Sequence, residues 1–308
     1  MQIDRGASDT EKQVMERQPL LLILLLFGGL SVLTAQQPRP AWLEVARAEH
    51  LMDRMEYGLA IQTLRSALAV APDDPHALAA LGRAYRAVGD FDVASEYFTF
   101  ALEHHEAFTG RGDRLMVRYE LASIHRERAD YSRYEHELSA IVREDPIPDG
   151  RAIPNGHQAI RDVGIDRFLV LYRLPESGST AARGMLAELL VGLGRYRAAA
   201  DHATFAVLQS MTTVIDAAIR RDPTFQFTTI ADLMRRVRRY PEVQSYLRDS
   251  RLDQDLYHLA AALWGEQDRG ALSVWQALAT IDPGGEWGAR AVRQLADPQL
   301  EPLLVPLR

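Results

Sequence analysis

The chain of 308 residues contains no cysteine. That absence excludes disulfide bonds, zinc sites with thiolate ligands, a cysteine nucleophile and a lipid-modified N-terminal cysteine. Lysine is nearly absent too, because Lys12 is the only one and every other permanently cationic side chain is arginine. We attribute this imbalance to the codon composition of a GC-rich bacterial genome rather than to selection for thermostability.

The sequence also lacks the signatures of common enzyme classes. No two of its 9 histidines have the His-Glu-x-x-His spacing, and neither a Gly-x-Ser-x-Gly elbow nor a phosphate-binding Gly-rich loop occurs. Gly192-Leu193-Gly194 begins like a dinucleotide fingerprint, but Arg197 replaces the third glycine. The adjacent His104 and His105 would point about 100° apart on a helix, which favours a solvated helix end over a metal site. We therefore expect no enzymatic activity, no cofactor and no metal.

The charge balance gives the chain no general attraction to nucleic acid. The formal net charge is -7, so binding to polyanions would need a local basic surface. The densest basic stretch is residues 235–239, where Arg235, Arg238 and Arg239 share one face of a helix. We interpret this face as a solvated one that pairs with nearby acids, and binding of an acidic partner or lipid head groups stays an alternative.

Residues 20–35 carry no charge and open with seven consecutive leucine or isoleucine residues. About 16 apolar residues are short for a bilayer span, which needs ~20, but they suit a secretory signal, and Ala35 fits a cleavage point. A cleaved signal is the preferred interpretation, with an uncleaved membrane anchor and a buried helix as alternatives. We expect an exported protein in the periplasm or on the outer face of the cytoplasmic membrane. Membrane contact would then come only from residues 20–35, if they are not cleaved.

The most informative stretch is residues 78–101. Leu78, Leu81-Gly82 and Tyr85 precede the break at Gly89-Asp90-Phe91, and Ala94, Phe98 and Ala101 follow it. Apolar and small residues three and four apart on both sides of a break predict two amphipathic helices folded against each other. The same pattern returns one period away, because Ala60 and Leu64 lie 34 residues before Ala94 and Phe98. Self-similarity at a fixed offset indicates a repeat architecture.

The spacing L-x-x-L-G-x-x-Y…A-x-x-x-F-x-x-A resembles the tetratricopeptide repeat. The resemblance implies an all-α fold, a right-handed α-solenoid of antiparallel helix hairpins with four to five repeats and a C-terminal capping helix. We expect residues 1–35 to form an N-terminal extension with the signal or anchor, residues 36–148 three repeats, and residues 149–179 an irregular insertion with one apolar stretch. Residues 180–297 would form repeats four and five with the cap, and residues 298–308 an irregular tail.

The resemblance also implies a partner-binding groove made by the first helix of each hairpin. Carrying the family positions onto this chain places six side chains in that groove: His76, Arg83, Arg86, Tyr119, Ser123 and Arg126. The three arginines would make the middle of the groove basic and suited to carboxylates on an extended segment.

We therefore expect a non-catalytic scaffold or adaptor of the bacterial cell envelope that binds a protein or peptide, and no nucleic acid. One alternative is an accessory subunit that binds a small or polymeric cell-wall ligand through the insertion. Another is a hydrolase, which would need a titratable pair in a deep pocket. A pocket lined by aromatic side chains around a buried carboxylate would favour these alternatives, and an open groove with exposed Tyr119, Arg83 and Arg86 would favour the scaffold.

Overall fold

The computed structural model describes residues 40–146 and 156–300. These residues form 14 α-helices and no strand, so the predicted all-α fold is confirmed. The expected signal or anchor at residues 20–35 lies outside the described residues, as do residues 147–155 and 301–308. No helix in the two described ranges is both long and apolar enough to cross a bilayer.

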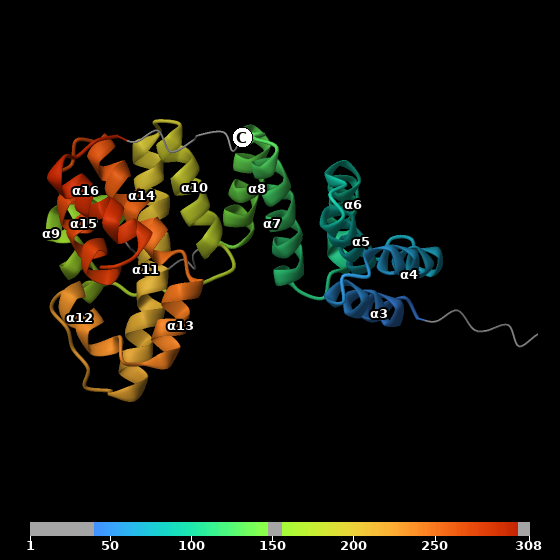
Figure 1. The fold of residues 1–308 in the computed structure, drawn as a ribbon, viewed down its shortest axis with the longest axis horizontal. Coiled ribbons are helices and arrows are strands. Elements are labelled where there is room, and N and C mark those ends of the chain that lie inside the picture. Colours follow the sequence, from blue (N-terminus) through green and yellow to red (C-terminus); the bar gives the residue numbers. More distant parts are fainter. Residues whose placement is uncertain (1–39, 147–155, 301–308) are drawn as a thin grey trace, which may run out of the picture.

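Ten of the helices form five antiparallel pairs along the chain, which we call hairpins 1 to 5 (Figure 1). Hairpin 1 is α3 (Ala41–Asp53) with α4 (Tyr57–Val70), hairpin 2 is α5 (Pro75–Ala87) with α6 (Phe91–Glu103), and hairpin 3 is α7 (Arg111–Glu127) with α8 (Tyr131–Glu144). Hairpin 4 is α10 (Thr180–Gly192) with α11 (Tyr196–Arg221), and hairpin 5 is α14 (Leu252–Gly265) with α15 (Gly270–Ile281). The last helix, α16 (Glu286–Ala296), packs on α15 where the sequence predicts a cap.

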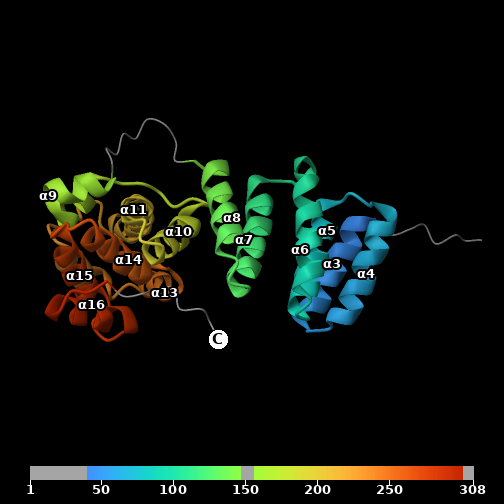
Figure 2. The same ribbon diagram turned by 90° about the horizontal axis from the view of Figure 1, so that it is seen from above.

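The hairpins follow one another in space as they do in the sequence. In both views of the ribbon, hairpin 3 lies between hairpins 1 and 2 on one side and the C-terminal helices on the other (Figures 1 and 2). One apolar cluster joins hairpins 1 and 2, a second joins hairpins 2 and 3, and a third extends from hairpin 3 to α16. The array is therefore stabilised by contacts between neighbours, as in a solenoid.

All five hairpins turn through the same backbone geometry. Two residues after the last residue of each first helix the backbone has positive φ, at Met55 (61°), Gly89 (83°), Ala129 (56°), Gly194 (71°) and Gln267 (58°). In each turn the next residue's N–H donates to a carbonyl five residues earlier, as in Asp90 N to Tyr85 O at 3.0 Å. This is the bond of a Schellman helix end, and glycine adopts its left-handed residue without strain. Only two of the five positions hold glycine.

Small residues set the distance between paired helices, as the sequence predicts. Gly82 of α5 faces Phe98 of α6, and a Cβ at position 82 would lie 2.7 Å from the ring carbon Cδ1 of Phe98. Phe98 is fully buried. Asp74 accepts a hydrogen bond from the backbone N–H of His76 at 3.0 Å and caps α5, which begins at Pro75.

Residues 156–179, the described part of the segment expected to be an irregular insertion, are largely helical. Within residues 149–179, α9 (Gly156–Leu171) is a helix that bends at Gly164, where φ is 77°, and it packs on α11 and α15. Residues 156–171 are therefore not irregular, and the helix includes the first four residues of the apolar stretch 168–174. The abundance of glycine and proline suggested a loop, but Gly164 only separates two helical pieces.

Hairpin 4 departs from the regular pattern in length. Its second helix, α11, has 26 residues, whereas α10 has 13. The short helices α12 (Ile230–Val237) and α13 (Pro241–Asp249) both pack on α11. They lie between residues 209 and 251, a stretch within the predicted repeats four and five whose spacing does not match the pattern of residues 78–101.

Candidate binding surfaces along the first helices

The six side chains predicted to line a groove lie on two neighbouring first helices. His76, Arg83 and Arg86 belong to α5, and Tyr119, Ser123 and Arg126 belong to α7. The structure brings Arg86 and Ser123 together, because Nη2 of Arg86 donates a hydrogen bond to Ser123 Oγ at 2.9 Å. It turns Tyr119 and Arg126 towards hairpin 4 instead.

Each of the three groove arginines faces at least one carboxylate. Arg83 pairs with Glu49 at 2.9 Å, and Arg86 pairs with Glu120 and, at 3.3 Å, with Glu127. Arg126 pairs with Glu188 of α10 at 3.0 Å. The expected basic middle of the groove is therefore offset by glutamates that the sequence pattern did not place there.

Several of these polar contacts join residues 34 positions apart. Arg83 with Glu49, Arg86 with Glu120, Arg111 with Asp145, and Asp145 with Ser179 all have this separation. Since 34 residues is also the period of the sequence pattern, the first two contacts link equivalent places on consecutive first helices, while Arg111 pairs with Asp145 inside hairpin 3 and Asp145 joins hairpin 3 to Ser179 before α10. The first two contacts therefore tie neighbouring hairpins to one another in register.

A groove of about 590 Å³ runs across the first helices of hairpins 1 to 3, and we call it the N-terminal groove. Trp42 and Glu49 of α3, His76 and Arg83 of α5, and Met116 and Glu120 of α7 are among its lining residues. Trp42 is 68% exposed and Met116 is 57% exposed, which is unusual for large apolar side chains. The ring of His76 packs edge-on against Phe108, which also lines the groove.

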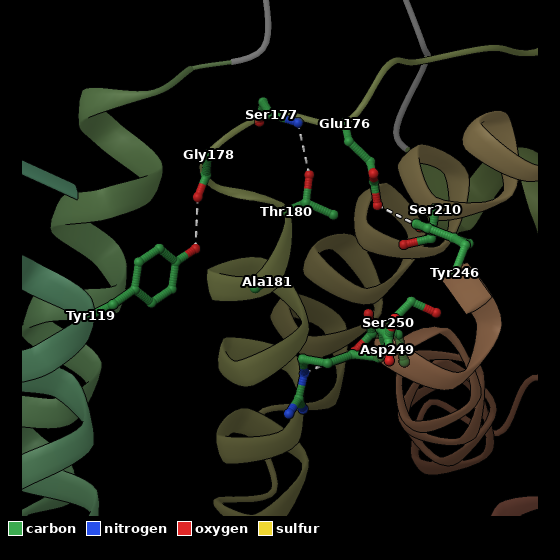
Figure 3. Close-up of a pocket in the computed structure, with 12 residues that line it drawn as sticks. Tyr119, Glu176, Ser177, Gly178, Thr180, Ala181, Ser210, Tyr246, Asp249 and Ser250 are labelled. Carbon is green, nitrogen blue, oxygen red and sulfur yellow. Dashed lines mark hydrogen bonds and ion pairs between the residues drawn. The ribbon is translucent and has the colours of Figure 1, made fainter. Parts of the chain in front are cut away.

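A second cavity, of about 400 Å³, lies between hairpins 3, 4 and 5, and we call it the Tyr119 pocket (Figure 3). Its wall on one side is Tyr119 of α7, and on the opposite side Tyr246 and Asp249 of α13. The segment around Glu176, which precedes α10, closes a third side. Ser210 of α11 and the start of α14 complete the lining, with Arg251 and Asp255.

Tyr119 is fixed by two backbone groups. Its hydroxyl donates to the carbonyl of Gly178 at 2.7 Å and accepts from the N–H of Ala182 at 3.0 Å. Burial raises the pKa of Tyr119 to about 12, so the phenol stays neutral. Tyr119 was expected to be exposed in an open groove, but it forms the wall of a pocket.

Asp255 is the buried acid of the pocket. It is 1% exposed, and burial raises its pKa to about 7. Its Oδ1 accepts no hydrogen bond and lies 3.7 Å from Nε of Arg251. The guanidinium of Arg251 is already bound to Glu188 at 2.9 Å. Burial likewise raises the pKa of Asp253 to about 6.

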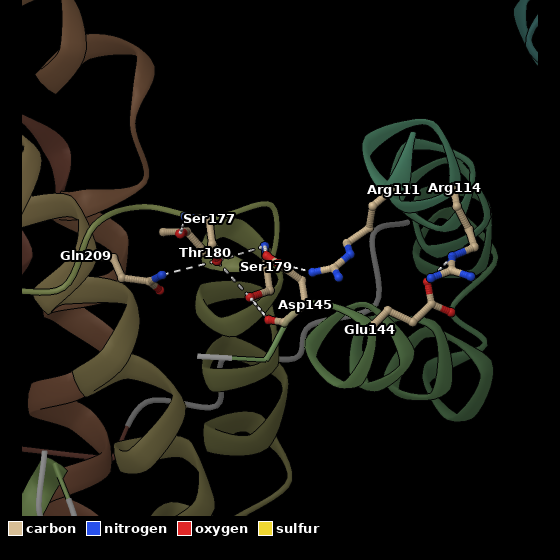
Figure 4. Close-up of polar contacts among 8 residues, drawn as sticks. All are labelled: Arg111, Arg114, Glu144, Asp145, Ser177, Ser179, Thr180 and Gln209. Atoms are coloured by element: carbon tan, nitrogen blue, oxygen red, sulfur yellow. Dashed lines mark hydrogen bonds and ion pairs between the residues drawn. The ribbon is translucent and has the colours of Figure 1, made fainter. Parts of the chain in front are cut away.

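The segment before α10 is anchored by polar contacts from hairpins 3 and 4 (Figure 4). Asp145 accepts from the N–H of Ser179 at 3.0 Å and pairs with Arg111 at 3.4 Å. On the other side, the amide of Gln209 donates to Ser177 Oγ at 3.2 Å. These bonds hold the wall of the Tyr119 pocket between the two hairpins.

The histidine pair 104–105 and the basic stretch 235–239 line neither the N-terminal groove nor the Tyr119 pocket. His105 bonds to the carbonyl of Leu102, and His104 lies 3.7 Å from Asp73, so the two rings do not share a ligand. Across the described ranges, no group of three or more acids and histidines is arranged to hold a metal ion. In the basic stretch Arg235 and Arg236 pair with Asp232, whereas Arg238 Nη2 donates to the carbonyls of Thr280 and Ile281, so only part of the face is paired with acids as expected.

Sequence reasoning missed most of the Tyr119 pocket, because Tyr246 and Asp249 belong to a stretch without a repeat pattern. One signal was available: Asp255 is an acid directly before residues 256–263, which are apolar except for His258. Comparison with known proteins adds nothing to this assignment, since no family model and no curated protein matches the chain.

Proposed function

We propose that this chain is a non-catalytic scaffold of the tetratricopeptide type that binds an extended protein segment along its first helices. The exposed Trp42 and Met116 in the N-terminal groove carry the proposal. A partner that buries an aromatic side chain gains about 2 kcal/mol or more at such a position. The five hairpins with one turn geometry and a 34-residue register support the resemblance.

The proposed location is the bacterial envelope, on the basis of the apolar residues 20–35. Mass spectrometry of the purified protein would test it. A mature N-terminus at residue 36 supports export with cleavage, and an intact N-terminus in the membrane fraction supports an anchor. An intact protein in the cytosolic fraction would contradict both.

Peptide display with the full-length protein as bait tests the binding function. We expect enriched peptides with a large apolar residue that bind the wild type and bind the double variant Trp42→Ala/Met116→Ala at least tenfold more weakly. The matched control is Leu193→Ala/Val292→Ala, which shortens two side chains of similar exposure away from the groove. The proposal fails if no peptide is enriched, or if enriched peptides bind both double variants equally.

A ligand-binding accessory subunit is a second candidate, and the Tyr119 pocket favours it. Two tyrosines around a buried carboxylate are the features that we expected to distinguish this candidate from a scaffold. The segment near Glu176, from the expected insertion, lines the pocket as well. The two candidates are compatible, because the pocket and the N-terminal groove share no lining residue.

A further inference from the structure

The Tyr119 pocket is a cavity that the proposed binding of a protein segment in the N-terminal groove does not use. At about 400 Å³ it falls within the range of small-molecule sites. Its walls come from four parts of the chain, and two of them are pinned by the bonds of Tyr119 and Ser179 described above. The pocket is therefore built by the fold rather than by loosely placed surface side chains.

The lining of the pocket carries an excess of negative charge. Among its twelve residues are three acids, Glu176, Asp249 and Asp255, and one base, Arg251. Arg251 lies 3.7 Å from Asp255 and pairs with Glu188, which also pairs with Arg126, so the negative charge of the lining comes mainly from Glu176 and Asp249. A cation entering the pocket would meet a favourable field.

Asp255 and Ser250 present polar atoms that have no hydrogen-bond partner. Asp255 is only 1% exposed, and neither its Oδ1 nor the Oγ of Ser250 makes a hydrogen bond. Gly184 makes room for this carboxylate, since a Cβ there would lie 2.1 Å from Oδ1. A buried acceptor without a donor costs about 1–3 kcal/mol, which a ligand with several N–H groups can offset.

The two tyrosines distinguish an organic cation from a metal ion. Tyr119 and Tyr246 stand on opposite sides of the cavity (Figure 3), and aromatic faces attract ammonium and guanidinium groups while covering an alkyl chain. A metal ion would need several carboxylates converging on one point, an arrangement that the described residues do not contain.

We propose that the Tyr119 pocket binds an alkylammonium or guanidinium group, with Glu176 and Asp249 as its charge partners. Two sources share this chemistry: a free diamine or polyamine, and the end of a lysine or arginine side chain on a bound protein. The inference does not depend on the N-terminal groove.

Isothermal titration of the full-length protein with cadaverine, agmatine and the neutral analogue 1,5-pentanediol tests the site. We expect the two amines to bind and the diol not to bind, with affinity that falls as salt is added because the acids at the mouth are exposed. The double variant Glu176→Gln/Asp249→Asn keeps the shapes of both side chains and should weaken amine binding at least tenfold. The matched control, Glu106→Gln/Asp73→Asn, changes two exposed acids elsewhere and should leave binding unchanged.

Thermal unfolding of each variant shows whether lost binding reflects lost folding. Tyr246→Leu keeps all three acids but removes the aromatic face and the hydroxyl that donates to Glu176 Oε1, and it should weaken amine binding, whereas Tyr246→Phe removes the hydroxyl alone. Capped tripeptides with central lysine or arginine distinguish the sources, because a protein side chain predicts tighter binding of the peptides than of the diamines. Equal binding of diol and amine, tighter binding of Mg²⁺ than of amines, or unchanged binding in Glu176→Gln/Asp249→Asn would overturn the proposal. Amine binding should persist in Trp42→Ala/Met116→Ala, so this site and the N-terminal groove can fail separately.

Discussion

The buried carboxyl of Asp255 gives the protein a pH-dependent stability that can be measured directly. Its pKa is 3.8 in the unfolded reference and about 7 in the fold, where burial disfavours the charged form and Arg251 opposes this effect only partly. The folded chain therefore binds this proton more tightly than the unfolded chain. The resulting stability is fully present below about pH 4 and is lost as pH rises to about 7.

The size of the effect follows from the two pKa values. At about 1.4 kcal/mol per pKa unit, the interval from 3.8 to about 7 corresponds to on the order of 4 kcal/mol of unfolding free energy. Asp255→Asn keeps the size of the side chain and cannot ionise. It should leave Arg251 paired with Glu188, which also pairs with Arg126. We expect the variant to exceed the wild type in stability by about 2–4 kcal/mol at pH 8 and to match it at pH 4.

Urea unfolding followed by circular dichroism between pH 4 and pH 8 is the assay. Asp249→Asn serves as the control, because this exposed acid should change the midpoint little at any pH. A smaller slope with pH should remain in Asp255→Asn, since burial also raises the pKa of Asp253 to about 6. If Asp255→Asn is less stable than the wild type at pH 8, the carboxylate is ionised and stabilising, and the reasoning is wrong.

Four further substitutions test the packing of the hairpins through urea midpoints. Ala129→Gly should stabilise the protein by about 1 kcal/mol, and Gly89→Ala should destabilise it by a similar amount, because both residues have positive φ. A Cβ at position 89 would meet no atom within 4 Å, so only the backbone conformation is tested there. A destabilising Ala129→Gly or a stabilising Gly89→Ala would refute the turn geometry. Gly82→Ala should destabilise by up to about 2 kcal/mol, since overpacking against Phe98 exceeds the gain in helix propensity, and in a Phe98→Leu background it should become neutral or stabilising. Tyr119→Phe should lower stability by about 1–3 kcal/mol by leaving two backbone groups unpaired, and an unchanged midpoint would show that water replaces the hydroxyl.

The paired helices were predictable because they depend on local periodicity. Leu78, Leu81 and Phe98 recur at helical spacing, and the break at Gly89 is visible as glycine. The turns at Met55, Ala129 and Gln267 have the same geometry but hold residues that rarely adopt positive φ. At these three turns the packing of the neighbouring helices determines the backbone conformation. A prediction based on turn residues alone therefore finds only some of the hairpins.

The candidate sites were predictable only in part, because ion pairs and cavities depend on distant residues. The sequence places Arg83 and Arg86 on a first helix but does not show that Glu49 and Glu120 lie opposite them. The Tyr119 pocket joins residues up to 136 positions apart, from Tyr119 to Asp255, and one of its walls belongs to no repeat. The spacing of residues along one helix does not predict which residues from other helices will line the same pocket.

The unequal lengths in hairpin 4 explain why this cavity exists at all. At about 1.5 Å per residue, α11 extends about 39 Å and α10 about 20 Å, so half of α11 overhangs its partner. The helix α13 packs on α11, and this packing places Tyr246 and Asp249 opposite Tyr119. A few extra turns on one helix are thus sufficient to add a side wall to an open array, and cutting α11 back to the length of α10 would leave that wall without support.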